Sequence, residues 1–293
     1  MKNVKDMKNQ SIGIEIETIG LTNRQAALVI GEYFKTKKTL YKTNDNYNSY
    51  TVKDTKGRTW RCMSDCSLSH NKSSEITSPI LYWDDIEDLK NIVIKLREAG
   101  AYVNYSCGVH VHIGAQNLDV QSLLNLVNVM YSKEDLIFKA LKVSKSRANR
   151  WCKKVDTNFL TKLKENKPNS LQDFKHLWYT TQSGVIPTLW YEHYDVSRYH
   201  ALNLHSYFQR GTVEFRLFDG SLDENSIEAY VKFCAAIVTY AENVTKTSAK
   251  KIDTDNDKYS FRVFMIKLGM KGEEFKTSRE ILMRNLEGNS AWR

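Results

Sequence analysis

The stretch Ser11-Ile-Gly-Ile-Glu-Ile-Glu-Thr-Ile19 alternates apolar and polar side chains with a period of two. This alternation predicts a β-strand, because successive side chains of a strand point to opposite faces. The isoleucines would lie on one face, and Glu15 and Glu17 would share the other. Two carboxylates about 7 Å apart repel by roughly 2 kcal/mol at an effective dielectric near 20, and a cation between them would reverse that sign. The alternative is a half-exposed strand whose solvent-facing side happens to carry glutamates.

The composition limits the class of protein. The 293 residues are enough for one large domain or two small ones, and we expect one. Five scattered cysteines favour reduced thiols over a disulfide framework. We find no apolar run of signal-peptide length at the N-terminus and none of the roughly 20 residues that a membrane span needs, so we expect a cytoplasmic protein with no membrane partner. The net charge of +9 permits attraction to nucleic acid or to an anionic nucleotide or peptide, but the lysine-rich run from Lys133 to Lys175 is also typical of a solvated helix face.

Strands and helices are interspersed along the rest of the sequence. In chain order, the predicted elements are a helix from Thr22 to about 34, a hairpin of 50–53 and 58–63 with its turn at 54–57, a strand around Glu75, a helix begun by an Asp84/Glu87 capping pair and ended by Gly100, strands at 101–104 and 107–114, helices over much of 119–175 with a loop at 166–170, irregular aromatic-rich sequence to Asp195, strands at 201–208 and 212–218, a helix after Asp223, and helices at 259–268 and 273–286. This order predicts an α+β fold with a largely antiparallel sheet flanked by helices.

Further predicted strands repeat the pattern of the first, with chemically active side chains opposite an apolar row. His110 and His112 share one face of their strand, Glu214 and Arg216 share one face of another, and Glu75 adds a fourth position. Because isolated buried carboxylates are costly, their recurrence in one sheet predicts a single polar cavity. Hard oxygen ligands with an imidazole suit Mg²⁺ or Mn²⁺ better than structural zinc. Arg216 adds a planar donor suited to carboxylate or phosphate.

Six motifs in this order carry a resemblance to a known family: Gly13-Ile-Glu-Ile-Glu17, Asp65-Cys-Ser-Leu68, Glu75-Ile-Thr-Ser-Pro79, Cys107-Gly-Val-His-Val-His112, Arg198-Tyr-His-Ala-Leu-Asn-Leu204 and Gly211-Thr-Val-Glu-Phe-Arg-Leu217. From about residue 11 to 245, the chain resembles the putative amidoligase family, which is similar to glutamine synthetase and glutamate-cysteine ligase. The resemblance implies one catalytic domain over 1–293, with a helical insertion at about 119–195 and C-terminal helices at about 255–290. It also implies a curved sheet of the glutamine-synthetase-like catalytic type around a metal–ATP site. ATP would phosphorylate a carboxylate, and an amine would then displace phosphate from the acyl phosphate.

The resemblance also implies a role for individual residues by motif position. Glu17 and Glu75 would hold one divalent ion, Mg²⁺ or Mn²⁺. A second ion, nearer the transferred phosphate, would be held by Glu15, His110 and Glu214. The remaining roles are a contact to the ATP phosphates by His112, neutralisation of the acyl phosphate by Arg216, a catalytic role for Arg198 and for Glu214, and nucleotide binding by Asn203.

Three places fit the family less directly. Glutamine synthetase has a further metal-binding Glu with no counterpart here, and Asp65 is the candidate substitute. Cys66 stands where the family often has Gly, which affects the local turn but no ligand. The segment 146–152 also resembles the family, and there Arg147 or Arg150 would contact substrate or nucleotide. An ordinary helical segment is the alternative.

Two rival functions remain at the level of sequence. A metal-dependent hydrolase would use His110, His112 and a Glu to activate water, and it would need no nucleotide. A nucleic-acid-binding protein would use the +9 charge and would bind with steep salt dependence, but no recognised motif supports it. For the ligase, the expected partners are a carboxylate-bearing and an amine-bearing substrate, such as an amino acid, peptide, polyamine or modified macromolecule. The sequence does not distinguish among them.

Overall fold

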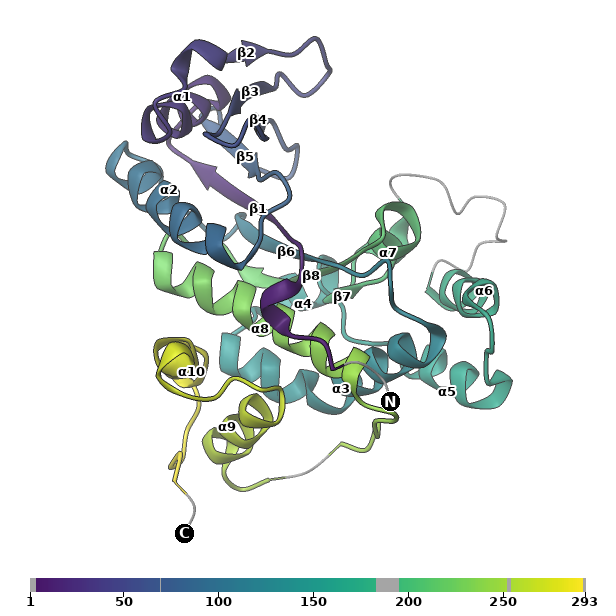
Figure 1. Cartoon of the computed structure of the whole chain (residues 1–293). Helices are drawn as coiled ribbons and strands as arrows, with labels where there is room; N and C mark the ends of the chain where they lie inside the picture. Colours follow the sequence, from purple (N-terminus) through teal and green to yellow (C-terminus); the bar gives the residue numbers. More distant parts are fainter. Residues whose placement is uncertain (1–3, 69, 183–194, 252–253, 292–293) are drawn as a thin grey trace. The chain divides into compact units, whose positions relative to one another are not determined.

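Eight strands form one open sheet in a computed structural model that describes residues 4–68, 70–182, 195–251 and 254–291 (Figure 1). Their order is β2-β3-β4-β5-β1-β6-β8-β7, and the pairs β2–β3, β3–β4, β4–β5, β5–β1 and β7–β8 are antiparallel. The strands are β1 Ile12–Ile19, β2 Tyr41–Lys42, β3 Tyr50–Lys53, β4 Thr59–Met63, β5 Ser73–Thr77, β6 Gly108–Gly114, β7 Leu202–Asn203 and β8 Thr212–Asp219. The prediction of a mixed fold with an antiparallel sheet flanked by helices is confirmed.

The α-helices of the described residues are α1 Asn23–Tyr33, α2 Ile86–Glu98, α3 Val120–Leu141, α4 Lys145–Arg150, α5 Thr157–Asn166, α6 Leu171–Gln182, α7 His205–Arg210, α8 Glu224–Asn243, α9 Asp257–Lys267 and α10 Lys276–Met283. None of these helices is both long and apolar enough to cross a membrane. The chain divides into two compact units. The first unit is Ser11–Val111 with Phe218–Val231, and the second unit comprises the described parts of Met1–Gln10, His112–Leu217 and Lys232–Arg293. The expectation of a single domain stays a prediction.

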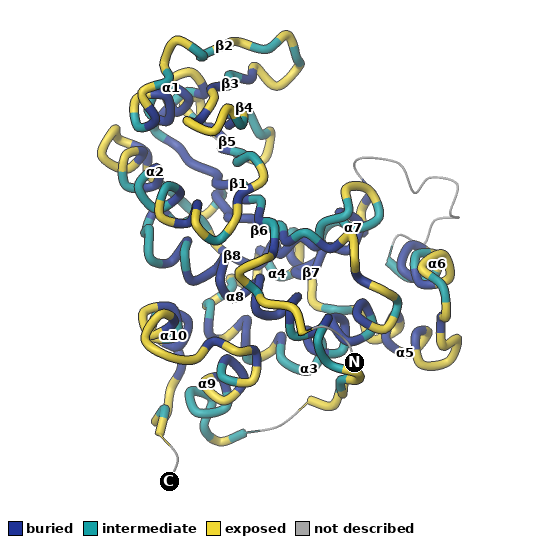
Figure 2. Tube along the Cα trace, in the orientation of Figure 1, coloured by how far each residue is buried: buried dark blue, intermediate teal, exposed yellow. Residues whose placement is uncertain are grey.

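The first unit is built on β1, as the alternation of its sequence predicts. Ile12, Ile14 and Ile16 are almost fully buried, and β1 pairs with β5 in an antiparallel register. In Figure 2, β1 is buried or intermediate along its whole length, whereas the short β2 is exposed. The inner strands of this unit therefore hold its core.

Local sequence signals fix the helices and the hairpin of the first unit. Thr22 caps α1 in a reciprocal pair with Gln25, and α1 packs against β3, β4 and β5 and beside α2. The β3–β4 hairpin turns where expected, because the Asp54 carboxylate accepts the backbone N–H groups of Lys56 and Arg58.

The predicted capping pair before α2 was wrong by one position. A 3₁₀ turn, Trp83–Asp85, precedes α2, and the carboxylate of Asp85 accepts the backbone N–H of Tyr82. The predicted pair was Asp84 with Glu87. Asp85 is favoured because it also binds the side chains of Lys56 and Arg58, which sequence spacing along a helix does not reveal.

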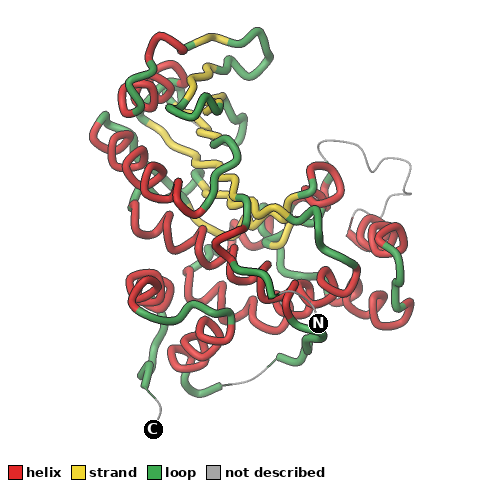
Figure 3. The backbone as a smooth tube through the Cα atoms, in the orientation of Figure 1, coloured by secondary structure: helices red, strands yellow, loops and turns green. Residues whose placement is uncertain are grey.

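The second unit is mostly helical, as Figure 3 shows. Asp119 caps α3, which contacts α5, α9 and α10. The helices α5 and α6 pack through Phe159, whose ring meets Phe174 and Trp178 edge to face. The predicted helices over 119–175 and near the C-terminus are confirmed. The irregular stretch predicted after Lys175 was wrong at its start, because α6 continues to Gln182, and its remainder at 183–194 lies outside the described residues.

Two predicted strands were wrong. The segment 201–208 contains only the two-residue β7, followed by α7. Leu204 and Phe208, four positions apart, fit helical as well as strand spacing, and Gly211 ends α7 in the left-handed conformation with φ of 72°. The segment 101–104 forms only one bridge, between Tyr102 and Ile19.

Candidate active-site residues

Three carboxylates gather on the sheet of the first unit, and we call Glu17, Asp65 and Glu75 the acidic cluster. Glu17 on β1 stands directly opposite Glu75 on β5 in the antiparallel register. Asp65 comes from the loop after β4, and one oxygen of each residue lies within 4.8 Å of one oxygen of the other two. Glu17 and Glu75 are buried. The structure thus brings together the two residues assigned to one metal ion, with Asp65 beside them.

The environment of the acidic cluster fits a divalent cation. Burial raises the pKa of Glu75 well above its ordinary value, and the charges of Glu15, Asp65 and Glu17 raise it further. The backbone N–H of Gly108 donates to Glu17 at 2.6 Å and supplies little compensating charge. Three hard oxygen donors of net negative charge suit Mg²⁺ or Mn²⁺, which would remove the repulsion.

Glu15 and His110 form a second pair on the same sheet. His110 Nδ1 lies 2.9 Å from Glu15 Oε2, and the imidazole is buried. Glu15 is two residues from Glu17 on β1, and His110 is two residues from Gly108 on β6. The predicted proximity of Glu15 and His110 is therefore present, whereas their role in holding an ion is a proposal.

In the second unit, Glu214 and Arg216 lie on one face of β8, as their spacing predicts. A guanidinium N–H of Arg216 donates to one oxygen of Glu214, and the amide of Asn203 donates to the other at 2.6 Å. Asn203 stands opposite Glu214 in the β7–β8 register. Glu214, Arg216 and Asn203 are all buried, so this network holds a charged pair away from solvent.

Arg147 and His112 reach the same strand of the second unit. The buried guanidinium of Arg147, on α4, donates to the backbone carbonyl of Arg216 at 3.2 Å. His112 Nδ1 lies 3.3 Å from the hydroxyl of Thr212 and 3.5 Å from that of Ser206. These contacts place Arg147 and His112 beside β8, the strand of Glu214 and Arg216.

Arg150 and Arg198 lie in less enclosed surroundings. Arg150 is exposed, and its guanidinium stacks 4.5 Å from the ring centre of Trp151. Arg198 ends a short 3₁₀ turn and lies 5.5 Å from the ring centre of Tyr199. Their assigned roles stay predictions.

Sequence reasoning did not identify three of the residues that make these contacts. Ser206 and Thr212, which bond to each other at 2.9 Å beside His112, were not singled out. Thr212 lies two residues before Glu214 on one strand face, a signal that could have found it. The Gly108 N–H that bonds Glu17 carries no side-chain signal at all.

The protein has a mixed α/β fold, and its antiparallel sheet carries buried carboxylates, imidazoles and an arginine of the kind that gather at functional sites. Residues 8–238 match the family described as "Putative amidoligase enzyme". The match covers more than half of the 293 residues, so the chain belongs to this family and the resemblance of its six motifs is confirmed. The family's name indicates an enzyme that joins carboxylates and amines. None of the curated proteins compared with the chain matches it.

Proposed function

We propose that this protein is an ATP-dependent carboxylate–amine ligase of the glutamine-synthetase-like catalytic type. The observation that supports it most is the buried network of Asn203, Glu214 and Arg216 on β7 and β8, in a chain of the amidoligase family. An arginine held in this way can neutralise an anion without first rearranging, which is the main protein contribution to phosphoryl and acyl transfer.

The proposed reaction has two steps. A carboxylate oxygen of the first substrate attacks the γ-phosphorus of ATP, the bond to the bridging oxygen breaks, and ADP leaves. The amine nitrogen of the second substrate then attacks the acyl carbon, phosphate leaves with the bonding electrons, and the amine gives up a proton. Activation is needed because a carboxylate resists attack by amines.

The residues of the chain divide this work. Arg216 neutralises the acyl phosphate, while Glu214 and Asn203 keep its guanidinium in place. His112 contacts the ATP phosphates, and Arg147 contacts nucleotide or substrate from α4. In the proposal, Arg198 assists at the acyl group and Arg150 adds a nucleotide contact.

Two sets of acidic residues would hold divalent ions, Mg²⁺ or Mn²⁺. The first set is the acidic cluster, in which Asp65 takes the place of the family's further Glu. The second set is Glu15, His110 and Glu214. When bound, such ions neutralise the charge of the ATP phosphates. The convergence of both sets on one cavity is part of this proposal.

The reaction is tested by incubating the protein with Mg²⁺, ATP and pooled amino acids, polyamines and peptides. We expect ADP and a product lighter by one water than the sum of its two precursors. Hydroxylamine added with ATP and the acid should trap a hydroxamate. Cleavage of ATP to AMP and pyrophosphate would contradict the acyl phosphate, and product formation that is equally fast without nucleotide would contradict the ATP-dependent mechanism.

Arg216→Lys separates chemistry from nucleotide binding. We expect nucleotide affinity to change less than twofold and turnover to fall about 10²-fold, because a point charge cannot reproduce the planar contact of a guanidinium. Calorimetry and steady-state kinetics measure the two effects. The control is Arg210→Lys at the exposed end of α7, which should leave both values unchanged. Equal losses of affinity and turnover in Arg216→Lys would assign the residue to nucleotide binding instead.

A further inference from the structure

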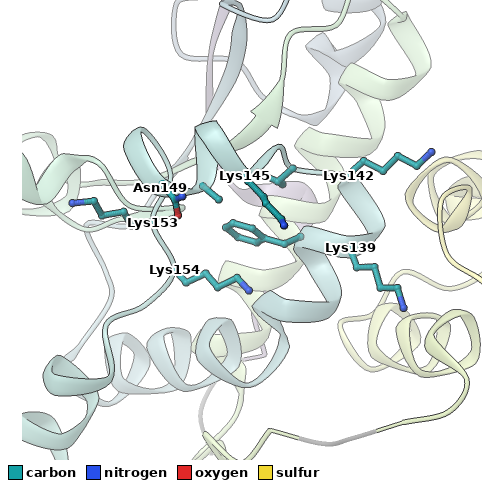
Figure 4. Close-up of a pocket in the computed structure, with 9 residues that line it drawn as sticks. Lys139, Lys142, Lys145, Asn149, Lys153 and Lys154 are labelled. Carbon is teal, nitrogen blue, oxygen red and sulfur yellow. The ribbon is translucent and has the colours of Figure 1, made fainter.

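A pocket of about 730 Å³ lies in the second unit, between the C-terminal part of α3, the helix α4 and the segment after α4 (Figure 4). Its polar lining consists of Lys139, Lys142, Lys145, Asn149, Lys153 and Lys154. Phe138, Val143 and Ala148 supply apolar surface. We call it the lysine pocket. Its volume is in the range of pockets that hold a small organic ligand.

The charge of the lysine pocket is only partly neutralised by the protein. Lys139 pairs with Asp257, and Lys154 shares Asp135 with Lys251. None of the described carboxylates forms an ion pair with the other three lysines of the pocket, Lys142, Lys145 and Lys153. The pocket therefore keeps an excess of positive charge that an anionic ligand would neutralise.

The arrangement of the side chains suits a ligand with both charged and apolar parts. In Figure 4, the ends of Lys145 and Lys154 approach the middle of the pocket from two sides, while Lys142 and Lys153 extend outward in opposite directions. The ammonium of Lys154 lies 5.0 Å from the ring centre of Phe138. The lysine ammonium groups thus surround the apolar surface of the pocket. The amide of Asn149 can donate or accept a hydrogen bond.

The lining favours phosphate over carboxylate. The pocket contains five lysines and no arginine. Carboxylates are best matched by the planar fork of arginine, whereas lysine binds phosphate as a compact point charge. A phosphate group also brings a charge of about −1.5 to −2 at pH 7, so two groups can balance the excess within a small volume.

The lysine pocket is separate from the contacts of the candidate active-site residues on the same helix. Lys145, Ala148 and Asn149 of α4 line the pocket, whereas the buried Arg147 reaches the carbonyl of Arg216 on β8. From these observations we propose that the lysine pocket binds a small molecule with two or more phosphate groups. The proposal does not depend on the ligase reaction.

The probes are inorganic tripolyphosphate and ADP, with citrate as a carboxylate of comparable charge, titrated calorimetrically into metal-free full-length protein. The double variant Lys145→Gln/Lys153→Gln should weaken tripolyphosphate binding at least tenfold. The control is Lys164→Gln/Lys250→Gln, which removes two exposed lysines of the same unit and the same total charge, and should change binding less than twofold. Because Lys145 and Lys153 are exposed, both double variants should keep the wild-type thermal midpoint.

The outcomes separate the possibilities. Tighter binding of ADP than of tripolyphosphate would identify a nucleotide as the ligand, and the reverse would identify an inorganic or highly phosphorylated one; both support the proposal if the pocket variant loses them. Equal weakening by the control variant would show that only net charge matters and would overturn it. Citrate binding as tight as tripolyphosphate would overturn the assignment to phosphate. Arg216→Lys should leave tripolyphosphate binding unchanged, and a loss there would place the probe at the candidate active-site residues instead.

Discussion

Two groups of buried carboxylates in the first unit differ in what surrounds them. At the β3–β4 turn, Arg58 binds both Asp54 and Asp85, and Lys56 also binds Asp85. In the acidic cluster, each carboxylate has two other carboxylates within 4.8 Å. Burial alone would raise the pKa of Asp85, but the hydrogen bonds of Arg58 and Lys56 outweigh it and lower that pKa. For Glu75, burial and the neighbouring negative charges act together and raise the pKa.

The contrast separates carboxylates that are paired with basic side chains from carboxylates that repel one another. We call Asp54, Asp85, Arg58 and Lys56 the turn group. Each of its two buried carboxylates pairs with a basic side chain of the same group. In the acidic cluster, a bound cation would reduce the repulsion among the three carboxylates. A fold that tolerates such repulsion in its core is typical of a binding or catalytic site.

The largest expected effect comes from breaking the turn group. Asp85→Ala removes one of the two carboxylates that bind the half-buried guanidinium of Arg58, and it leaves the N–H of Tyr82 without its acceptor. We expect a loss of about 3–5 kcal/mol of unfolding free energy, measured by urea denaturation. The neighbouring exposed Asp84→Ala is the control and should cost less than about 0.5 kcal/mol. A loss of that small size in Asp85→Ala would show that the group contributes no stability.

The pH dependence of the turn group follows from the sign of the shift. The folded pKa of Asp85 lies below its ordinary value, so its stabilisation is fully present above that ordinary value. It is lost as the pH falls through the lower, folded pKa. Wild-type stability should therefore fall more steeply in acid than that of Asp85→Ala.

Glu134 in the second unit is a third buried carboxylate, and nearby positive charges compensate its burial only in part. It is almost fully buried on α3 and accepts the backbone N–H of Val155 at 2.8 Å. Burial raises its pKa to about 8, although Val155, Lys251 and Lys154 act in the opposite direction. The unfolded chain loses this proton near pH 4.5 while the folded chain keeps it, so stability should decline as the pH rises from about 4.5 to 8.

Glu134→Gln should remove that decline, because glutamine keeps the acceptor and never ionises. The difference between variant and wild type should grow to about 4 kcal/mol at pH 8 and be small at pH 4.5. Urea denaturation at several pH values measures it, with the exposed Glu165→Gln as control. A constant difference across this range would contradict the raised pKa.

The smallest expected change in stability comes from the acidic cluster itself. Glu17→Gln removes one crowded charge and keeps an acceptor for the N–H of Gly108, so the metal-free protein should gain about 1 kcal/mol. The same variant should lose most of its affinity for Mn²⁺ and for Mn²⁺–ATP, as calorimetry would show. Glu87→Gln on the exposed side of α2 should change neither value. Unchanged Mn²⁺ affinity in Glu17→Gln would reject the acidic cluster as a metal site.

The sequence predicts those elements of the first unit whose signals are local. Alternation in β1, the Thr22 cap of α1 and the turn at Asp54 each depend on a few neighbouring residues. It also predicts which side chains share a strand face, as Glu214 and Arg216 do. In the second unit, the strand expected at 201–208 failed because helix and strand spacing coincide there.

Partners across strands could not be predicted from spacing. The register that sets Glu17 opposite Glu75, or Asn203 opposite Glu214, depends on packing between distant segments. Asp85 rather than Asp84 precedes α2 for the same reason, because its partners Lys56 and Arg58 are distant in sequence. Motif order supplied the residues of the candidate active site, but their contacts required the fold.

The pairing of β1 with β5 has a consequence for synthesis of the chain. Glu17 and Glu75 are 58 positions apart, so β1 leaves the ribosome first and its partner follows roughly 3–12 s later at about 5–20 residues per second. Until then, the isoleucine face of β1 lacks this strand beside it. We expect Glu17 and Glu75 to come into proximity only when β5 pairs with β1, while the isoleucine face of β1 is being buried. In pulse-labelled refolding of the full-length chain, amide protection of β1 and β5 should also follow that of the β3–β4 hairpin, because the partners in the hairpin are much closer in sequence.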